Sequence, residues 1–236
     1  MIMYKRVIIK VSGEALKGDT MHGIDPKTML KIARDIKEVH DLGVEIGIVV
    51  GGGNIWRGKS AASLGMDRAQ ADYMGMLATI MNGLALQDAL EKLNVPSRVA
   101  SAIEVNQVSE RYIRKKVEKH LKLKTVYIFV GGTGSPYFTT DTAAALRAAE
   151  LNAEVILMGK NGVSGVYDKD PKKYQDAIMF NELTHKFVLE QGLEIMDSTA
   201  ASLCKENKID LIVFNIEEEG NLKKAVLGKK VGTKVT

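Results

Sequence analysis

Short apolar runs alternate with longer amphipathic segments from one end of the chain to the other. The runs are rich in Val, Ile and Leu and are nearly continuous, which is typical of strands in a parallel sheet that is covered on both faces. Strands are therefore predicted at Val7–Val11, Glu45–Val50, Thr125–Val130, Glu154–Met158 and Asp210–Asn215.

The segments between these strands have the end signals of helices. Pro26–Leu42 begins after Asp25 and stops before Gly43, because Pro favours a first helical turn and Gly favours a helix end. Further helices are predicted at Asp67–Leu93, Ser109–Leu121, Thr140–Leu151, Asp197–Asn207 and Leu222–Leu227. Strands that alternate with helices form crossover units, so the pattern predicts an α/β fold: a three-layer αβα sandwich with a mainly parallel sheet.

Composition narrows the class of protein. The 236 residues are 45% hydrophobic and 26% charged, with a net charge of +4, which excludes disordered and collagen-like chains. No repeat, low-complexity tract or linker divides the chain, so we predict one domain over residues 1–236. The small positive surplus does not by itself indicate nucleic-acid binding. The basic run Arg111–Lys124 is the best candidate for such binding, but it is more typical of a solvated helix face.

Several other classes of site and location are also disfavoured. The chain shows neither a secretory signal nor an apolar stretch of the roughly 20 residues that cross a bilayer, so we expect a soluble cytoplasmic protein without membrane contact. The single Cys204 excludes an intramolecular disulfide and is expected to be a small buried residue rather than a nucleophile. The histidines lack the spacing of metal ligands, so no protein metal site is predicted; they are His22, His40, His120 and His185.

Glycines follow four of the predicted strands directly. They stand in Ser12-Gly13, Gly51-Gly52-Gly53, Gly131-Gly132-Thr133-Gly134 and Gly159-Lys160-Asn161-Gly162. The carboxyl ends of parallel strands meet at one edge of the sheet, where α/β proteins bind their ligands. Glycine lets backbone N–H groups approach an anion closely. Tight turns would explain any one of these loops but explain all four poorly, so we predict a site with room for more than one phosphate-bearing ligand.

Charged side chains accompany the glycine loops. Lys10 lies in the first strand, Arg57 follows the triple glycine, and Asp141 stands at the start of a predicted helix. Phosphoryl transfer needs positive charge on the transferred oxygens and usually Mg²⁺, so these three residues are candidates for it. From spacing alone, Lys10 could equally be an edge residue of the sheet, and Asp141 could be only a helix N-cap.

A second phosphate motif overlaps the second loop. Gly53–Ser60 fits the P-loop pattern G-x-x-x-x-G-K-[ST], in which Lys59 would contact the phosphates. Gly65 makes the following segment a poor start for the long helix, and no later predicted strand ends in the Asp that holds Mg²⁺ in P-loop proteins. The P-loop interpretation is therefore disfavoured.

Five sequence blocks resemble the bacterial uridylate kinases of the amino-acid kinase superfamily. The blocks are KVSGEAL at Lys10–Leu16, GGGNIWRG at Gly51–Gly58, DYMGMLATIMNGLALQDAL at Asp72–Leu90, GTGSPYFTTDTAAALRA at Gly132–Ala148 and GVYDKDP at Gly165–Pro171. They occur in order along essentially the whole chain. The resemblance implies the amino-acid kinase fold and the reaction ATP + UMP → ADP + UDP, with Mg²⁺ carried by ATP, in de novo pyrimidine nucleotide synthesis.

The resemblance also implies site residues, position by position. The ATP-binding residues would be Lys10, Val11, Ser12, Gly13, Gly53, Arg57, Asn161, Tyr167 and Asp170. The UMP-binding residues would be Gly52, Asp72, Thr133, Gly134, Ser135, Pro136, Tyr137, Phe138, Thr139 and Thr140. Lys10, Arg57 and Asp141 would stabilise the transition state. UMP would then bind within about residues 1–150, and the ATP nucleoside within about residues 151–236.

The family assembles as hexamers, is commonly inhibited by UTP and is often activated by GTP, so the resemblance implies the same here. A matching GTP segment contains Gly18, Asp19, Thr20, Met21, His22 and Gly23. Against GTP activation, the stretch at Gln87, Glu91 and Arg98 lacks the basic and imidazole character of that site. Separately, Ser135 replaces the usual family Asn beside the phosphates, where a hydroxyl in place of an amide could change turnover or be compensated by water. The apolar circumference of the Asp67–Leu93 helix independently suggests burial in a subunit interface.

Two other functions stay open at this stage. The first is a kinase of the same superfamily that acts on a carboxylate or a carbamate. The second is a regulatory module that senses pyrimidine nucleotides or contacts DNA through residues 111–124.

Overall fold

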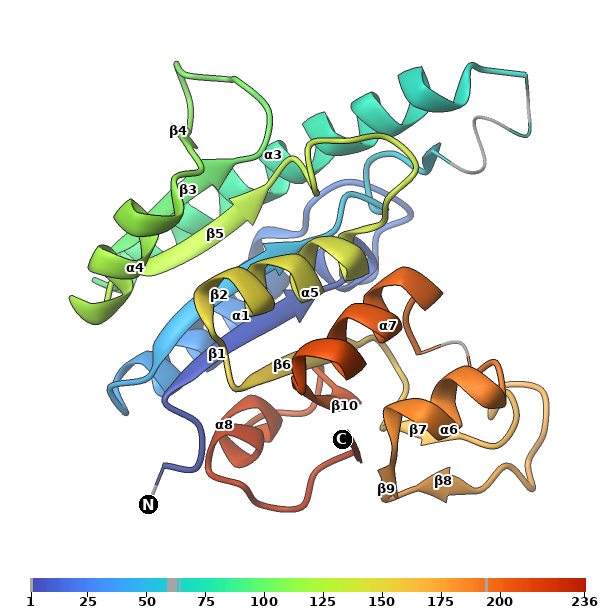
Figure 1. The fold of residues 1–236 in the computed structure, drawn as a ribbon. Coiled ribbons are helices and arrows are strands. Elements are labelled where there is room, and N and C mark those ends of the chain that lie inside the picture. Colours follow the sequence, from blue (N-terminus) through green and yellow to red (C-terminus); the bar gives the residue numbers. More distant parts are fainter. Residues whose placement is uncertain (1, 59–62, 64, 194) are drawn as a thin grey trace.

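Within the described residues, the computed structural model contains a nine-stranded sheet with helices on both of its faces (Figure 1). The described residues are 2–58, 63, 65–193 and 195–236. The strands of this sheet are β1 (Arg6–Val11), β2 (Glu45–Val50), β3 (Ser97–Ser101), β4 (Glu110–Arg111), β5 (Val126–Val130), β6 (Val155–Lys160), β9 (Glu182–Leu183), β10 (Asp210–Asn215) and β11 (Thr233–Val235). A separate pair is formed by β7 (Val166–Tyr167) and β8 (Met179–Phe180).

The strand order is β4-β3-β5-β2-β1-β6-β10-β11-β9. All neighbours pair in parallel except β10 and β11, so the sheet is mainly parallel with a reversed edge. The strand β1 lies between β2 and β6, in the middle of the sheet. A side chain that leaves the carboxyl end of β1 is therefore close to the loops that follow both neighbours.

Helices cover the sheet as two layers. They are α1 (Pro26–His40), α3 (Arg68–Lys92), α4 (Arg114–Lys122), α5 (Thr140–Leu151), α6 (His185–Glu190), α7 (Ser198–Asn207) and α8 (Asn221–Val226), together with the short 3-10 helix η1 (Gly13–Leu16). The helices α1, α3 and α8 pack on one face, where Val7 and Ile9 belong to the apolar core. The helices α4, α5 and α7 pack on the other face, where Ile8 and Met158 belong to a second core. This is the predicted three-layer architecture.

Most of the predicted elements are confirmed to within one or two residues, because continuous apolar runs and capping residues are local signals. The predicted helix Asp67–Leu93 is α3, in which Asp67 is the N-cap: its side chain accepts a hydrogen bond from the Gln70 N–H at 2.9 Å. Cys204 is buried in the core of the α7 face, and burial raises the pKa of its thiol to about 12, so the interpretation of Cys204 as a small buried residue is confirmed.

The helix predicted over Ser109–Leu121 is wrong in its first turn. Glu110 and Arg111 instead pair with Ala100 and Ser101 as β4 and β3, and α4 begins only at Arg114. The pairing partner lies on a different segment, so local periodicity did not reveal it. The shorter elements β3, β7, β8, β9, β11, α6 and η1 were also not predicted.

No helix in the described part of the chain is long and apolar enough to cross a membrane.

Candidate active site

The loops after β1 and β2 lie against each other at the carboxyl edge of the sheet. A Cβ atom on Gly13 would stand 2.6 Å from the backbone nitrogen of Gly53, and one on Gly52 would stand 2.8 Å from the carbonyl oxygen of Gly75 in α3. Any larger residue at these two positions would force the loops and α3 apart. The glycines therefore serve close packing of the backbone as well as access to a ligand.

Lys10 and Asp141 meet at the centre of this edge. The Lys10 Nζ lies 2.6 Å from Asp141 Oδ1, and Lys10 is only 8% exposed. Because β1 is a central strand, Lys10 is not an edge residue. Asp141 is not the helix cap either: the Thr139 hydroxyl oxygen caps α5 by accepting from the Asp141 N–H at 3.0 Å. The Asp141 carboxylate is thus directed to Lys10, as phosphate chemistry would require.

A second lysine, Lys160, lies beside this pair and was not identified as a site residue from the sequence. It is the last residue of β6, and its ammonium donates a hydrogen bond to the Ile195 carbonyl oxygen at 2.6 Å. Partial burial lowers the pKa of Lys160, and the positive charge of Lys10 lowers it further, while Asp141 acts in the opposite direction. Lys160 lies two residues after Met158, which pairs with Lys10 in the sheet. This spacing is the sequence signal that could have identified Lys160 as a site residue.

Asp197 was also missed, and it joins the amino ends of α7 and α5. Its carboxylate accepts hydrogen bonds from the hydroxyls of Thr139 and Thr142, the latter at 2.9 Å, and from the Ala200 N–H at 2.9 Å. Burial raises the pKa of this carboxyl, but these hydrogen bonds outweigh burial and hold the pKa below its ordinary value. The network fixes the turn that presents Asp141.

A cavity of about 150 Å³ lies on the β2 and β5 side of the Lys10–Asp141 pair. Six of the predicted UMP residues line it: Gly52, Asp72, Thr133, Phe138, Thr139 and Thr140. Gly134, Ser135, Pro136 and Tyr137 lie in the same loop but are not wall residues. We call this the acceptor cavity.

Hydrogen bonds between distant segments hold the acceptor cavity. The Asp72 carboxylate accepts from the Arg68 guanidinium at 2.9 Å and from the Tyr137 N–H at 2.8 Å. Tyr137 adopts a φ of 72°, a left-handed conformation that is unfavourable for a bulky residue, so the Asp72 bond stabilises a strained turn. The indole N–H of Trp56 donates to the Ala71 carbonyl oxygen at 2.9 Å. The sequence did not indicate the role of Trp56.

A wider cavity of about 490 Å³ lies on the β6 and β10 side and is called the donor cavity. Lys160, Tyr167 and Asp170 line it, together with apolar residues that include Val213 and Ile195. Asn161 follows Lys160 in the chain but is not one of the wall residues. Asn161, Tyr167 and Asp170 are the ATP-binding residues that the resemblance implies for the nucleoside, and two of these three thus line one cavity.

The remaining predicted phosphate ligands occupy different environments. Val11 is buried at the end of β1, and Ser12, Gly13 and Gly53 form the loops beside Lys10. The side chain of Arg57 is 62% exposed and pairs with Glu14 at 2.5 Å. Although burial acts to raise the pKa of Glu14, its bonds to Lys17 and Arg57 hold the pKa below the ordinary value. Lys59, the phosphate ligand of the P-loop interpretation, lies outside the described residues.

The predicted GTP segment, residues 18–23, forms a loop attached to the second glycine loop. The Gly23 N–H donates to the Asn54 carbonyl oxygen at 2.8 Å, and the Asn54 amide donates to the Gly23 carbonyl oxygen at 2.8 Å. Asn54 in turn exchanges hydrogen bonds with the buried Asn82 of α3. These hydrogen bonds connect the segment to Asn54, which directly follows Gly52 and Gly53 of the acceptor cavity wall.

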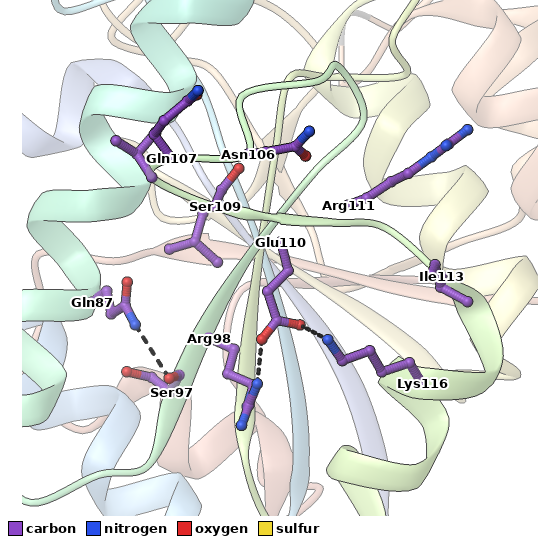
Figure 2. A pocket seen from close by; sticks show the side chains of 12 residues that line it. Gln87, Ser97, Arg98, Asn106, Gln107, Ser109, Glu110, Arg111, Ile113 and Lys116 are labelled. Carbon is purple, nitrogen blue, oxygen red and sulfur yellow. Dashed lines mark hydrogen bonds and ion pairs between the residues drawn. The ribbon is translucent and has the colours of Figure 1, made fainter.

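A third cavity, of about 640 Å³, lies beside β3 and β4 (Figure 2). Neither Lys10 nor Asp141 lines it. Gln87 and Arg98, which were compared with the GTP site, both line it. Glu110 stands between Arg98 and Lys116 and forms ion pairs with both (Figure 2). Three cations line this cavity. Arg98 and Lys116 pair with Glu110, and Arg111 pairs with Glu104 at 3.4 Å, so each cation that an anionic effector would meet here already has a carboxylate partner.

Three comparisons with known proteins show the family to which the chain belongs. A model of the amino acid kinase family matches residues 5–215. The chain is 60% identical over 234 residues to the uridylate kinase of Limosilactobacillus reuteri (strain DSM 20016), covering 99% of this chain and 98% of that protein. It is 59% identical over 237 residues to the uridylate kinase of Aster yellows witches'-broom phytoplasma (strain AYWB), covering 100% and 98%.

Solved structures give the same match. The UMP kinase from Bacillus anthracis superposes with a TM-score of 0.95 at 41% identity, covering 99% of this chain and 96% of that chain. The UMP kinase from Ureaplasma parvum superposes with a TM-score of 0.92 at 45% identity, covering 98% of each chain.

Proposed function

The chain belongs to the amino acid kinase family, and we propose that it has the activity of the uridylate kinases within that family. It transfers the γ-phosphoryl group of ATP to UMP and yields ADP and UDP. This reaction supplies the pyrimidine nucleotide pathway. The observation that supports it most directly is the position of the Lys10–Asp141 pair. The strand order β2-β1-β6 places this pair between the acceptor cavity and the donor cavity.

The two cavities match the two parts of such a reaction. Thr139 and Thr140 line the acceptor cavity and directly precede Asp141, so an acceptor phosphate bound there lies beside the pair. Lys160 lines the donor cavity and lies beside the same pair, so ATP phosphates reach it from the opposite side. Residues of about 1–150 then bind UMP, and residues of about 151–236 bind the ATP nucleoside.

The chemical step needs charge and alignment more than covalent help. An oxygen of the UMP phosphate forms the new bond to the γ-phosphorus while the bond from that phosphorus to ADP breaks. The Lys10 ammonium neutralises charge on the transferred group, and Asp141 holds Lys10 in place. Arg57 would add a second positive charge, for which it must exchange Glu14 for a phosphate.

The residues of the site fit Mg²⁺ that enters with ATP. No group of three His, Cys, Asp or Glu side chains in the described part of the chain could hold a metal by itself. Mg²⁺ is commonly held by one or two carboxylates and by substrate phosphates, and Asp141 can supply such a carboxylate here. Bound there, Mg²⁺ would neutralise phosphate charge.

An assay of ADP release with UMP, CMP, TMP and glutamate tests the proposed activity. We expect UMP to be strongly preferred, because a site that pairs its buried polar groups with one base leaves them unpaired with another. Comparable kcat/KM values for UMP and CMP would contradict the base selectivity. Activity with glutamate but not with UMP would favour the carboxylate kinase, and no activity with any acceptor would favour a regulatory module.

We also propose a homo-oligomer, in keeping with the hexamers of the family. On α3, Met76, Ile80 and Leu86 are buried within the chain. Leu77 and Met81 on another face are 51% and 55% exposed, so intramolecular packing does not account for the whole apolar circumference. Met81→Glu should reduce the sedimenting mass, while Lys92→Glu at the exposed end of α3 should not. An unchanged mass for Met81→Glu would argue against this interface.

Inhibition by UTP and activation by GTP are proposed on the same family basis. The bonds from residues 18–23 to Asn54 support an effector influence on the acceptor cavity. The pairing of Arg98 and Lys116 with Glu110 in the third cavity argues for weak GTP binding there. Initial rates with added UTP or GTP test both effects separately.

A further inference from the structure

Lys160 and Lys10 project from adjacent strands toward the same face of the sheet. In the parallel pairing of β1 with β6, Lys10 lies opposite Met158. Residues two apart on a strand share a face, so Lys160 shares the face of Met158 and Lys10. This is the face that α5 covers and on which Asp141 lies. The ammonium groups of Lys10 and Lys160 and the carboxylate of Asp141 therefore lie together on one face of the sheet.

The charges at this point do not balance. Asp141 forms its ion pair with Lys10, and among the described residues no carboxylate forms an ion pair with Lys160. Within the described part of the chain, the Lys160 ammonium donates one hydrogen bond, to the Ile195 carbonyl oxygen, which leaves two of its three protons for other acceptors. A partly buried cation without a counter-ion is unfavourable, and the lowered pKa of Lys160 reflects this. An anion from outside the chain would compensate it.

The position of Lys160 indicates which anion that is. Lys160 is a wall residue of the donor cavity, which Tyr167, Asp170 and Val213 also line. A nucleotide whose nucleoside lay against Tyr167 and Asp170 would have to extend its phosphates toward Lys10 to react there. Lys160 borders that path, because it lines the donor cavity and its charge interacts with that of Lys10. We propose that Lys160 is a second phosphate-binding cation of the transfer centre, which contacts the polyphosphate of ATP between the donor cavity and Lys10.

This role, which rests on the proposed function, is electrostatic throughout. Lys160 forms no covalent bond and transfers no proton: it stays an ammonium group while the γ-phosphoryl group passes from ATP to UMP and ADP is released. It assists by neutralising charge on the donor phosphates, and Lys10 does the same at the transferred group. Because the polyphosphate favours the charged form of Lys160, nucleotide binding also offsets the cost of its partial burial.

The experiment separates charge from local structure with three variants. Lys160→Gln keeps an N–H donor that can reach the Ile195 carbonyl oxygen but removes the charge. Lys160→Arg keeps the charge. Lys31→Gln is the matched control, because the Lys31 ammonium also donates to a backbone carbonyl oxygen, that of Glu217, at 2.7 Å. Calorimetry measures how each folded variant binds adenosine and the non-hydrolysable ATP analogue AMP-PNP with Mg²⁺.

We expect Lys160→Gln to weaken AMP-PNP binding about 10- to 100-fold, the usual effect of losing charge-assisted hydrogen bonds, and to leave adenosine binding unchanged. Lys160→Arg should restore most of the AMP-PNP affinity, and Lys31→Gln should bind both ligands as the parent protein does. Equal losses for adenosine and AMP-PNP would show that Lys160 acts only by holding the Ile195 segment. Unchanged AMP-PNP binding would likewise overturn the inference.

These binding measurements do not depend on turnover. A parent protein that binds AMP-PNP but forms no UDP would contradict the proposed function, while the ratio of AMP-PNP to adenosine affinity would still test Lys160. If Lys160→Gln fails to fold, Lys160→Met provides the same loss of charge with a similar side-chain length. The ratio of AMP-PNP to adenosine affinity then decides in the same way.

Discussion

The acceptor and donor cavities lie on either side of one ion pair and are built in different ways. The acceptor cavity is small, about 150 Å³, and its walls come from the 25-residue helix α3 and from loops cross-linked to it through Trp56 and Asp72. The donor cavity is about 490 Å³, and its walls come largely from residues 163–171, which contain the two-residue strand β7, and from residues 191–193 together with Ile195. In Figure 1, β7, β8 and α6 lie together beyond α7.

This difference indicates how each substrate is recognised. Bonds between distant segments fix the acceptor side before a ligand binds, and preorganised polar groups discriminate well between similar ligands. The donor cavity is larger and has the charge of Lys160 in its wall, so we expect ATP binding there to depend more on phosphate than on base. The Lys10–Asp141 ion pair lies between the two cavities and acts on the ligands of both.

The largest effect on catalysis is expected at Lys10, between the acceptor and donor cavities. Lys10→Ala should lower kcat on the order of 10²–10³-fold, since it removes a preorganised charge from the transferred group. Lys59, which lies outside the described residues, provides the contrast: Lys59→Ala should retain most of the activity. Steady-state UDP formation by both folded variants measures this. An inactive Lys59→Ala variant together with an active Lys10→Ala variant would contradict both the proposed site at Lys10 and the proposed mechanism.

On the acceptor side, Asp72→Asn should raise KM for UMP about 10- to 100-fold and leave KM for ATP unchanged. The substitution weakens hydrogen bonds to a charged acceptor, each of which contributes about 1.5–3 kcal/mol, and it releases the strained turn at Tyr137. Initial rates with each substrate varied in turn measure this split. Equal changes in both KM values would mean that the cavities are not independent.

On the donor side, Tyr167→Ala should raise KM for ATP on the order of 10-fold without changing KM for UMP. Stacking of a base on an aromatic ring contributes about 1–3 kcal/mol, and we expect the low end because the open cavity restrains the base weakly. Tyr167→Phe, which keeps the aromatic ring, should have the same KM for ATP as the parent protein. An increase in KM for ATP that exceeds the increase in KM for UMP caused by Asp72→Asn would contradict the proposed contrast between the acceptor and donor cavities.

The smallest effect on catalysis is expected at Asp35, in the packing of α1 outside both cavities. Burial raises the pKa of Asp35 to about 6, opposed by Lys31 and reinforced by Glu38 and Glu219. An unfolded Asp ionises near 3.9, so between about pH 4 and pH 6 the folded state binds more protons, and this group destabilises the fold as pH rises through that range.

Asp35→Asn should therefore leave the kinetics unchanged but raise the free energy of unfolding at pH 8 by about 1–3 kcal/mol, with the gain disappearing toward pH 4. Urea unfolding at the two pH values measures it. Asp88→Asn on the surface is the control and should change stability by less than about 1 kcal/mol. A gain that is the same at both pH values would contradict the titration of Asp35.

The local pattern of the sequence determined most of the framework. Continuous apolar runs specified the central strands, and residues such as Asp25 and Asp67 specified the helix starts, because both signals depend only on near neighbours. The glycine loops predicted the edge at which Lys10 and Asp141 meet, since parallel strands bring their carboxyl ends together.

Tertiary structure alone decided which charges share that edge. Lys160 joins Lys10 because β6 pairs with β1 in one register, although the two residues are 150 positions apart. Asp197 joins Thr139 through the packing of α7 on α5, and Arg57 is paired with Glu14 across two loops. The strand β4 likewise exists only because β3 offers it an edge. Such contacts depend on strand register and helix packing over the whole chain, which no window of neighbouring residues contains.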